Sequence, residues 1–68
     1  MATIYKKFGQ KVRKLRKQLG LSQEKLAELA RIDPKSIVEI ESGKRNPTLK
    51  TIRKIASALK TKPSKFLS

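Results

Sequence analysis

Apolar residues recur along the chain at the spacing of amphipathic α-helices, and the first such stripe lies near the N-terminus. Its members are four, four, three and four residues apart: Ile4, Phe8, Val12, Leu15 and Leu19. This spacing places them on one face of a helix. Gly20 follows as a C-terminal cap, whereas Gly9 lies within the stripe and weakens the helix by up to about 1 kcal/mol relative to Ala. The pattern predicts a first helix that ends just before Gly20.

A second, shorter helix is predicted over residues 23–30. Ser22 is a typical N-cap, and Glu24 in the first turn interacts favourably with the helix dipole. The expected buried positions are Leu26, Leu29 and Ala30, with the small Ala27 beside them.

A third helix is predicted to start after Asp33, because an acidic N-cap followed by proline at the first helical position is a typical helix start. Pro34 occupies that first position. Ile37 and Ile40 are expected to face inward, and Gly43 ends the helix. This helix is again short.

A fourth helix is predicted to follow Thr48 as its N-cap, with the apolar stripe Leu49, Ile52, Ile55, Ala56 and Leu59. A last helical turn begins at Pro63 and carries Phe66 and Leu67, which either close the core or lie at a dimer interface. No strand alternation or internal repeat is present. The sequence therefore predicts an all-α fold, a compact four- to five-helix bundle, and a single domain over residues 1–68.

The charge balance indicates the class of partner. The chain has 18 Lys and Arg residues against 5 Asp and Glu, a net charge of +13. A field of this sign attracts polyanions, nucleic acid first and anionic membrane second. No apolar run approaches the roughly 20 residues of a membrane span, so we expect no membrane partner.

The absence of Cys and His excludes several kinds of chemistry. Disulfides, zinc-finger ligands, thiol nucleophiles and imidazole bases are all ruled out. The sequence also has neither paired carboxylates suited to a cleft nor a glycine-rich phosphate loop. We therefore expect no enzymatic activity, no cofactor or metal, and no small-molecule ligand.

Two short helices joined by a tight turn form the frame of a helix-turn-helix, here over residues 23–42. Ala27 supplies a small residue where the two helices meet. The start of the third helix, which is the second helix of this motif, is polar, as expected for a segment that enters the major groove of DNA.

The run LSQEKLAELARIDPKSIVEIESGKRNPT, from Leu21 to Thr48, resembles the Cro/repressor class of prokaryotic helix-turn-helix regulators. Its ending is similar to restriction–modification controllers and single-domain repressors of that class. The resemblance implies a five-helix, lambda-repressor-like domain that binds double-stranded operator DNA, usually as a dimer. It also implies a cytoplasmic protein associated with the nucleoid.

The resemblance assigns roles to individual residues. Those expected to face base edges are Pro34, Lys35, Ser36 and Glu39. Those expected to contact the DNA backbone are Gln23, Lys44, Arg45 and Asn46. Lys50 joins this second group because it lies near the start of the fourth helix, whose N–H groups can bind a phosphate. Arg16 and Glu41 match an internal salt bridge between the first and third helices.

Two positions leave alternatives open. Arg31 stands in the turn where the family commonly has Gly; it either adopts a left-handed conformation, at a strain of about 1–2 kcal/mol, or the turn closes differently and rotates the third helix. Glu39 either accepts a hydrogen bond from cytosine N4 or pairs with Lys35 one turn earlier.

All five acidic residues lie between Glu24 and Glu41, so the positive charge is concentrated in the flanks. This division favours phosphate binding by the flanks and base discrimination by the motif. The leading hypothesis is a sequence-specific transcriptional regulator, a repressor that binds an inverted-repeat operator as a homodimer through a recognition helix near residues 34–42. The alternatives are an antitoxin-type protein-interaction module that also binds DNA, and a non-specific RNA or chromatin binder.

Overall fold

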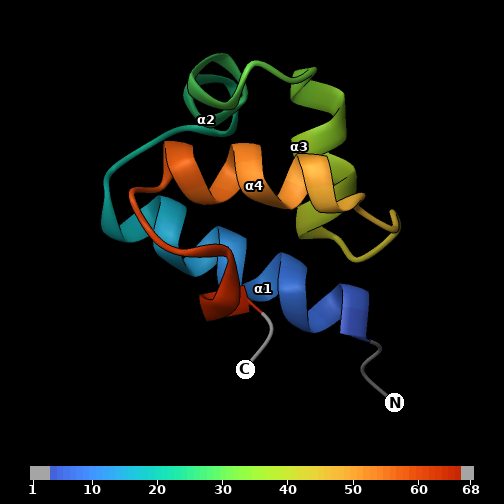
Figure 1. Ribbon diagram of the computed structural model, residues 1–68. Coiled ribbons are helices and arrows are strands. Elements are labelled where there is room, and N and C mark those ends of the chain that lie inside the picture. Colours follow the sequence, from blue (N-terminus) through green and yellow to red (C-terminus); the bar gives the residue numbers. More distant parts are fainter. Residues whose placement is uncertain (1–3, 67–68) are drawn as a thin grey trace.

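The computed structural model of the protein describes residues 4–66, which form five consecutive helical elements (Figure 1). They are α1 (Ile4–Gln18), α2 (Gln23–Ala30), α3 (Pro34–Glu41), α4 (Leu49–Ala58) and the 3₁₀ turn η1 (Pro63–Phe66). The described part of the chain contains no strand, and the predicted all-α bundle is confirmed.

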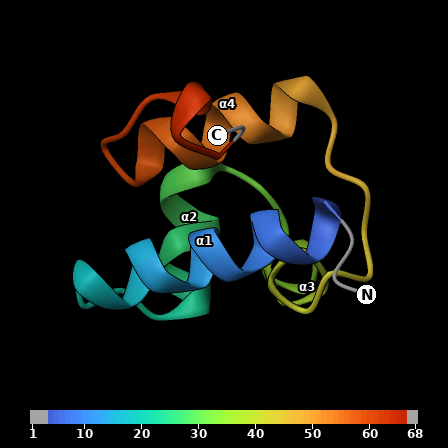
Figure 2. The same cartoon turned by 90° about the horizontal axis from the view of Figure 1, so that it is seen from below.

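The helices enclose one core. The short helix α3 packs against both α1 and α2, α4 packs against α2, and η1 contacts α1 and α4. Figure 2 shows α1 crossing in front of α2 and α3, with α4 along the upper edge of the view. The largest fully buried side chains come from four helices: Val12, Leu26, Ile37, Ile40 and Ile55. The position of α3 is therefore set mainly by α1 and α2, and α4 supports α2.

The residues that start the helices are those predicted from their N-cap chemistry. The Ser22 hydroxyl accepts a hydrogen bond from the Lys25 N–H at 3.0 Å. The Asp33 carboxylate does the same for α3, and the Thr48 hydroxyl for α4. A side-chain acceptor at this position satisfies one of the unpaired N–H groups at a helix start. The three predicted helix starts are confirmed.

The C-terminal turn closes the core. The rings of Phe8 and Phe66 pack edge to face, with centroids 5.0 Å apart and planes at 75°. Both side chains are buried, so Phe66 has the first of its two predicted roles. Leu67 lies outside the described residues.

Four residues predicted in the apolar stripes are exposed instead: Ile4 (67%), Leu19 (47%), Leu29 (48%) and Leu49 (59%). Ile4 and Leu49 begin their helices and Leu19 follows the end of α1, so no neighbouring element covers them. Leu29 lies within α2, but the helical rotation turns it roughly 200° from the buried Ala27. The periodicity of apolar residues therefore identified the helices, but the prediction that these four positions are buried was wrong.

Gly9 lies where α1 and α3 touch through their backbones. A Cβ atom at this position would lie 2.1 Å from the Ile40 carbonyl oxygen and 2.9 Å from that of Glu41. Such distances are well inside van der Waals contact, so only glycine fits without a shift of one helix. The residue that weakens α1 locally thus permits its close approach to α3.

The turn between α2 and α3 has its arginine in a strained backbone conformation. Arg31 has φ 57° and ψ 46°, the left-handed conformation that was one of the two alternatives. The Ile32 N–H donates to the Ala27 carbonyl at 3.0 Å, which closes α2 as a Schellman-type cap. Of the two alternatives for Arg31, the structure therefore has the strained left-handed conformation and not a turn closed with other dihedral angles.

Candidate nucleic-acid interface

The exposed side of α3 carries the four residues predicted to read bases. Pro34 and Lys35 are exposed, and Ser36 and Glu39 are half-buried. The Lys35 ammonium has no hydrogen bond or ion pair within residues 4–66. Since Ile37 and Ile40 of α3 are buried on its opposite side, this helix presents a surface of mixed polarity, which includes the exposed Val38 and which a major groove can accommodate.

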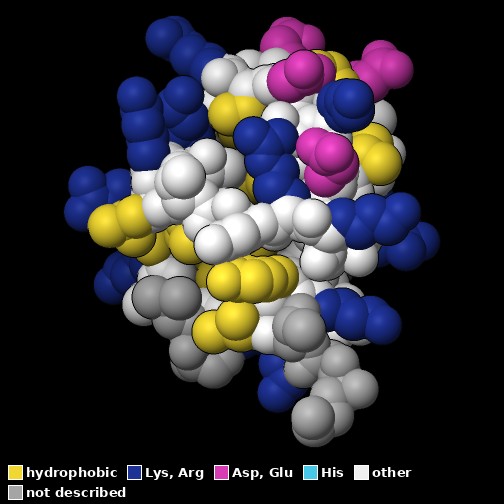
Figure 3. All heavy atoms as spheres, turned by 90° about the vertical axis from the view of Figure 1, so that its right-hand side faces the viewer, with side chains coloured by type: hydrophobic (Ala, Val, Ile, Leu, Met, Phe, Trp, Pro, Cys, Tyr) yellow, Lys and Arg dark blue, Asp and Glu magenta, His cyan; other side chains and the backbone are white. Residues whose placement is uncertain are grey.

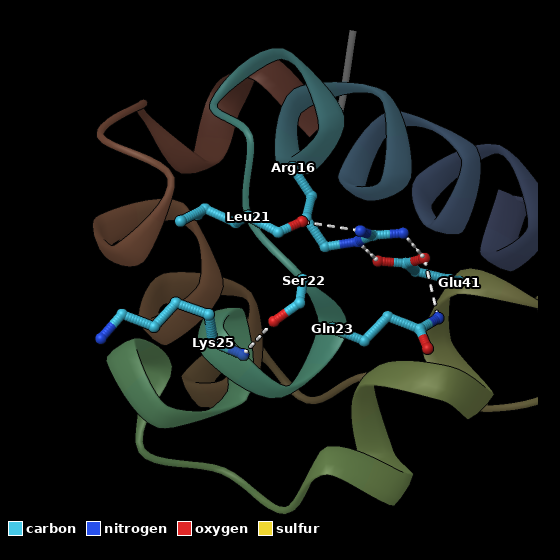
Figure 4. A network of polar contacts seen from close by, with 6 residues as sticks. All are labelled: Arg16, Leu21, Ser22, Gln23, Lys25 and Glu41. Carbon is cyan, nitrogen blue, oxygen red and sulfur yellow. Dashed lines mark hydrogen bonds and ion pairs between the residues drawn. The ribbon is translucent and has the colours of Figure 1, made fainter.

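A buried ion pair holds the C-terminal end of α3 against α1. Arg16 Nε donates to Glu41 Oε2 at 2.6 Å, and Arg16 Nη2 donates to Glu41 Oε1 at 3.0 Å. Arg16 Nη1 also donates to the Leu21 carbonyl at 2.8 Å, and Gln23 Nε2 donates to Glu41 Oε1 at 3.2 Å (Figure 4). One carboxylate thus joins α1, the start of α2 and the end of α3.

The position of this network makes it strong. The side chains of Arg16 and Glu41 are only 10% and 4% exposed, and their contact is bidentate. The hydrogen bond to Glu41 raises the pKa of the Arg16 guanidinium, burial opposes this, and the charge of Glu41 raises it further. Arg16 therefore stays charged, and the pair predicted by resemblance forms in the structure. It also orients Gln23, the first residue of α2.

Arg45 lies closer to α3 than its predicted contact with the DNA backbone requires. Its Nη1 donates to the Ser36 hydroxyl at 2.6 Å and contacts Glu39 Oε1 at 3.4 Å. Neither alternative for Glu39 anticipated this partner: its ion pair is with Arg45 and not with Lys35. No local spacing rule connects residues nine and six positions apart across a loop, so the sequence carried no signal for this contact.

The other predicted backbone-contacting residues flank this surface. Lys44 and Asn46 are exposed in the connection between α3 and α4, and Lys50 is exposed in the first turn of α4. The structure thus brings Arg45 onto α3, whereas these three side chains remain in solvent beside it.

The charges on this side of the molecule are arranged unevenly. Figure 3, which faces the side where α3 lies, shows acidic side chains gathered in the upper part and basic side chains mainly to their left and below them. The basic groups can approach the phosphates of a DNA backbone. Within residues 4–66, no acidic cluster could hold a metal ion, and no helix is long and apolar enough to cross a membrane.

Comparison with known proteins identifies this arrangement. The model of the helix-turn-helix family matches residues 12–66. This chain belongs to the helix-turn-helix family. As a family member of the Cro/repressor class, it is a DNA-binding transcriptional regulator and not an enzyme.

The relatives of this helix-turn-helix protein include controllers of restriction–modification systems. It is 44% identical over 61 residues to control protein C.BamHI of Bacillus amyloliquefaciens, covering 88% of this chain and 75% of that protein. It is 42% identical over 60 residues to control protein C.MunI of a Mycoplasma species, covering 87% and 81%. The solved structure of the restriction–modification controller protein C.AhdI from Aeromonas hydrophila matches with a TM-score of 0.89 at 44% identity, covering 91% of this chain and 94% of that one. The predicted lambda-repressor-like fold is confirmed.

Proposed function

We propose that this protein is a repressor that binds an inverted-repeat operator as a homodimer, with one α3 helix in the major groove of each half-site. The observation that carries this proposal is the exposed outer side of α3, with Lys35, Ser36 and Glu39 on it, and the buried Arg16–Glu41 pair that ties α3 to α1. Eight residues of helix reach only a few base pairs, so specificity in a genome requires two half-sites. The similarity to controller proteins supports genes of a restriction–modification system as the regulated genes, and the nucleoid as the place of action.

Within this proposal, the DNA-facing residues divide into two groups. Pro34, Lys35, Ser36 and Glu39 contact base edges. Gln23, Lys44, Arg45, Asn46 and Lys50 contact the phosphate backbone. The long stem and free ammonium of Lys35 suit guanine O6 and N7 or a phosphate, and the Glu39 carboxylate suits cytosine N4.

The test is selection of bound sites from random duplex DNA with the full chain. We expect an inverted repeat whose half-site centres are about 34 Å apart, one turn of the double helix. Sedimentation equilibrium of the protein with the recovered site should give two protomers per duplex. Recovery of no preferred motif would refute a specific repressor, and a single asymmetric site bound by one protomer would refute the homodimer.

The proposed readers are tested by repeating the selection with Lys35→Ala and with Glu39→Ala. Each variant should relax the base preference at one position of each half-site and leave the others unchanged. A motif identical to that of the parent protein would remove the substituted residue from the base-reading group.

A further inference from the structure

A hollow of about 390 Å³ opens on the surface between α1 and α3, beside the proposed recognition surface. Its lining residues come from three helices: Arg13, Arg16, Gln23, Val38, Glu41 and Ser42. Val38 and Ser42 are exposed residues at α3, and Gln23 begins α2. The hollow therefore lies where the side of α3 meets the first turn of α2.

Among the charged side chains that line this hollow, only Arg13 has no ion-pair partner within residues 4–66. Glu41 is occupied by Arg16 and Gln23, which contact both of its oxygens. Arg13 is exposed and has no hydrogen bond or ion pair within residues 4–66. Two guanidinium groups and one carboxylate leave the hollow with an excess of one positive charge. This charge has no counterpart in the described protein, so an external anion can satisfy it.

Helix geometry directs Arg13 towards this surface. Arg13 is four residues after Gly9 and three before Arg16, both of which contact α3, so all three lie on one side of α1. Lys14 is rotated by about 100° from Arg13. It lines a separate groove on α1, next to Lys65 of η1. The adjacent basic residues thus face different parts of the molecule.

We infer that Arg13 binds a phosphate of the DNA backbone in this hollow, at the edge of the major groove that α3 enters. A guanidinium presents two parallel N–H donors to phosphate oxygens, which suits a fixed backbone position. Gln23, which we propose to contact the DNA backbone, lines the same hollow from the neighbouring helix α2. This inference rests on the proposed function, since it requires α3 to be in the groove.

The experiment compares Arg13→Gln with Lys14→Gln, which removes the same charge from the other side of α1. Affinity for the selected operator is measured at several salt concentrations. Arg13→Gln should lower the affinity roughly tenfold near physiological salt and reduce the slope of log K against log salt by about 1 per bound protomer. Lys14→Gln should leave the slope close to that of the parent protein. Arg13→Lys should keep most of the slope because the charge remains.

Each outcome decides whether Arg13 makes a specific phosphate contact. Equal effects of Arg13→Gln and Lys14→Gln would overturn the inference, because they would show only a general loss of positive charge. Urea unfolding of each variant verifies that the fold is intact, which the exposure of both side chains leads us to expect. If the parent protein shows no preferred motif, the proposed function fails, but the two slopes measured on an arbitrary duplex still test Arg13. A preferred motif without an Arg13 effect overturns this inference alone.

Discussion

The Arg16–Glu41 pair at the foot of α3 and the Arg45–Glu39 pair on its outer side join the same residue types in different surroundings. The first has a 2.6 Å contact between side chains that are 10% and 4% exposed. The second has a 3.4 Å contact between side chains that are 50% and 40% exposed. Both pairs connect α3 to another part of the chain, so their difference lies in burial and geometry.

This difference in burial matches two requirements of a DNA-binding protein, namely a helix held in a fixed position and surface contacts that can be exchanged for contacts with DNA. A buried, bidentate pair fixes one geometry, because breaking it leaves a charge without water or partner. An exposed pair contributes little to stability and is readily exchanged for another ion. The Arg16–Glu41 pair (the inner pair) therefore holds α3 against α1. We propose that the Arg45–Glu39 pair (the outer pair) keeps Arg45 near Ser36 and Glu39 until DNA competes for all three.

The largest expected effect comes from breaking the inner pair. Glu41→Ala should lower the free energy of unfolding by about 3–5 kcal/mol, because Arg16 is left buried without a counterion. Urea denaturation measures this loss, and complete loss of cooperative unfolding is the same result in a domain this small. Glu39→Ala is the matched control and should cost less than about 1 kcal/mol. Similar losses for both variants would contradict the distinction between the pairs.

The second largest effect is expected at Gly9, where the backbones of α1 and α3 lie in close contact. Gly9→Ala should destabilise the protein by about 1–3 kcal/mol, because its Cβ would overlap the Ile40 carbonyl and push α1 from α3. Gly20→Ala is the control: a Cβ there meets nothing within 4 Å, so only the strain of its φ of +70°, about 1 kcal/mol, is expected. Thermal unfolding of the two variants distinguishes overlap from strain. A smaller loss for Gly9→Ala than for Gly20→Ala would show that the helices separate easily.

Removal of the outer pair should change DNA recognition more than stability. Arg45→Ala should lower the free energy of unfolding by less than about 1 kcal/mol. Because Arg45 touches Ser36 and Glu39, we expect it to alter base preference at the positions they contact, by roughly tenfold. Lys44→Ala should instead weaken binding to all sequences alike and reduce the salt slope by about 1. Binding to a panel of singly substituted operators measures both, and uniform weakening by Arg45→Ala would return Arg45 to a purely phosphate-contacting role.

The smallest effect is expected in the turn before α3. Arg31→Gly should stabilise the protein by about 0.5–1 kcal/mol, because glycine adopts the left-handed conformation without strain but has more freedom in the unfolded chain. Lys60→Gly, at the other non-glycine residue with φ 57° among those described, should give a similar gain outside the motif. Melting temperatures of the two variants test this, and a loss of stability specific to Arg31→Gly would reveal a favourable contact of the arginine side chain.

Much of the fold could be predicted because its signals are local. An N-cap residue acts on an N–H two or three positions later, so Ser22, Asp33 and Thr48 mark their helix starts without knowledge of the rest of the chain. The central apolar positions were predicted for the same reason. Leu29 and Leu49 were assigned wrongly, because burial depends on which neighbouring helix covers a side chain and not on periodicity alone.

The sequence by itself therefore determined where α2, α3 and α4 begin, the excess of positive charge outside the motif, and the family to which the chain belongs. Only the tertiary structure decided that Gly9 allows α3 to approach α1 closely and that Arg45 reaches Ser36 and Glu39. It also decided that Arg13 lines the hollow beside α3, whereas Lys14 lines a separate groove on α1. These contacts join residues from different helices and loops, and they depend on crossing angles and distances that short-range spacing does not specify.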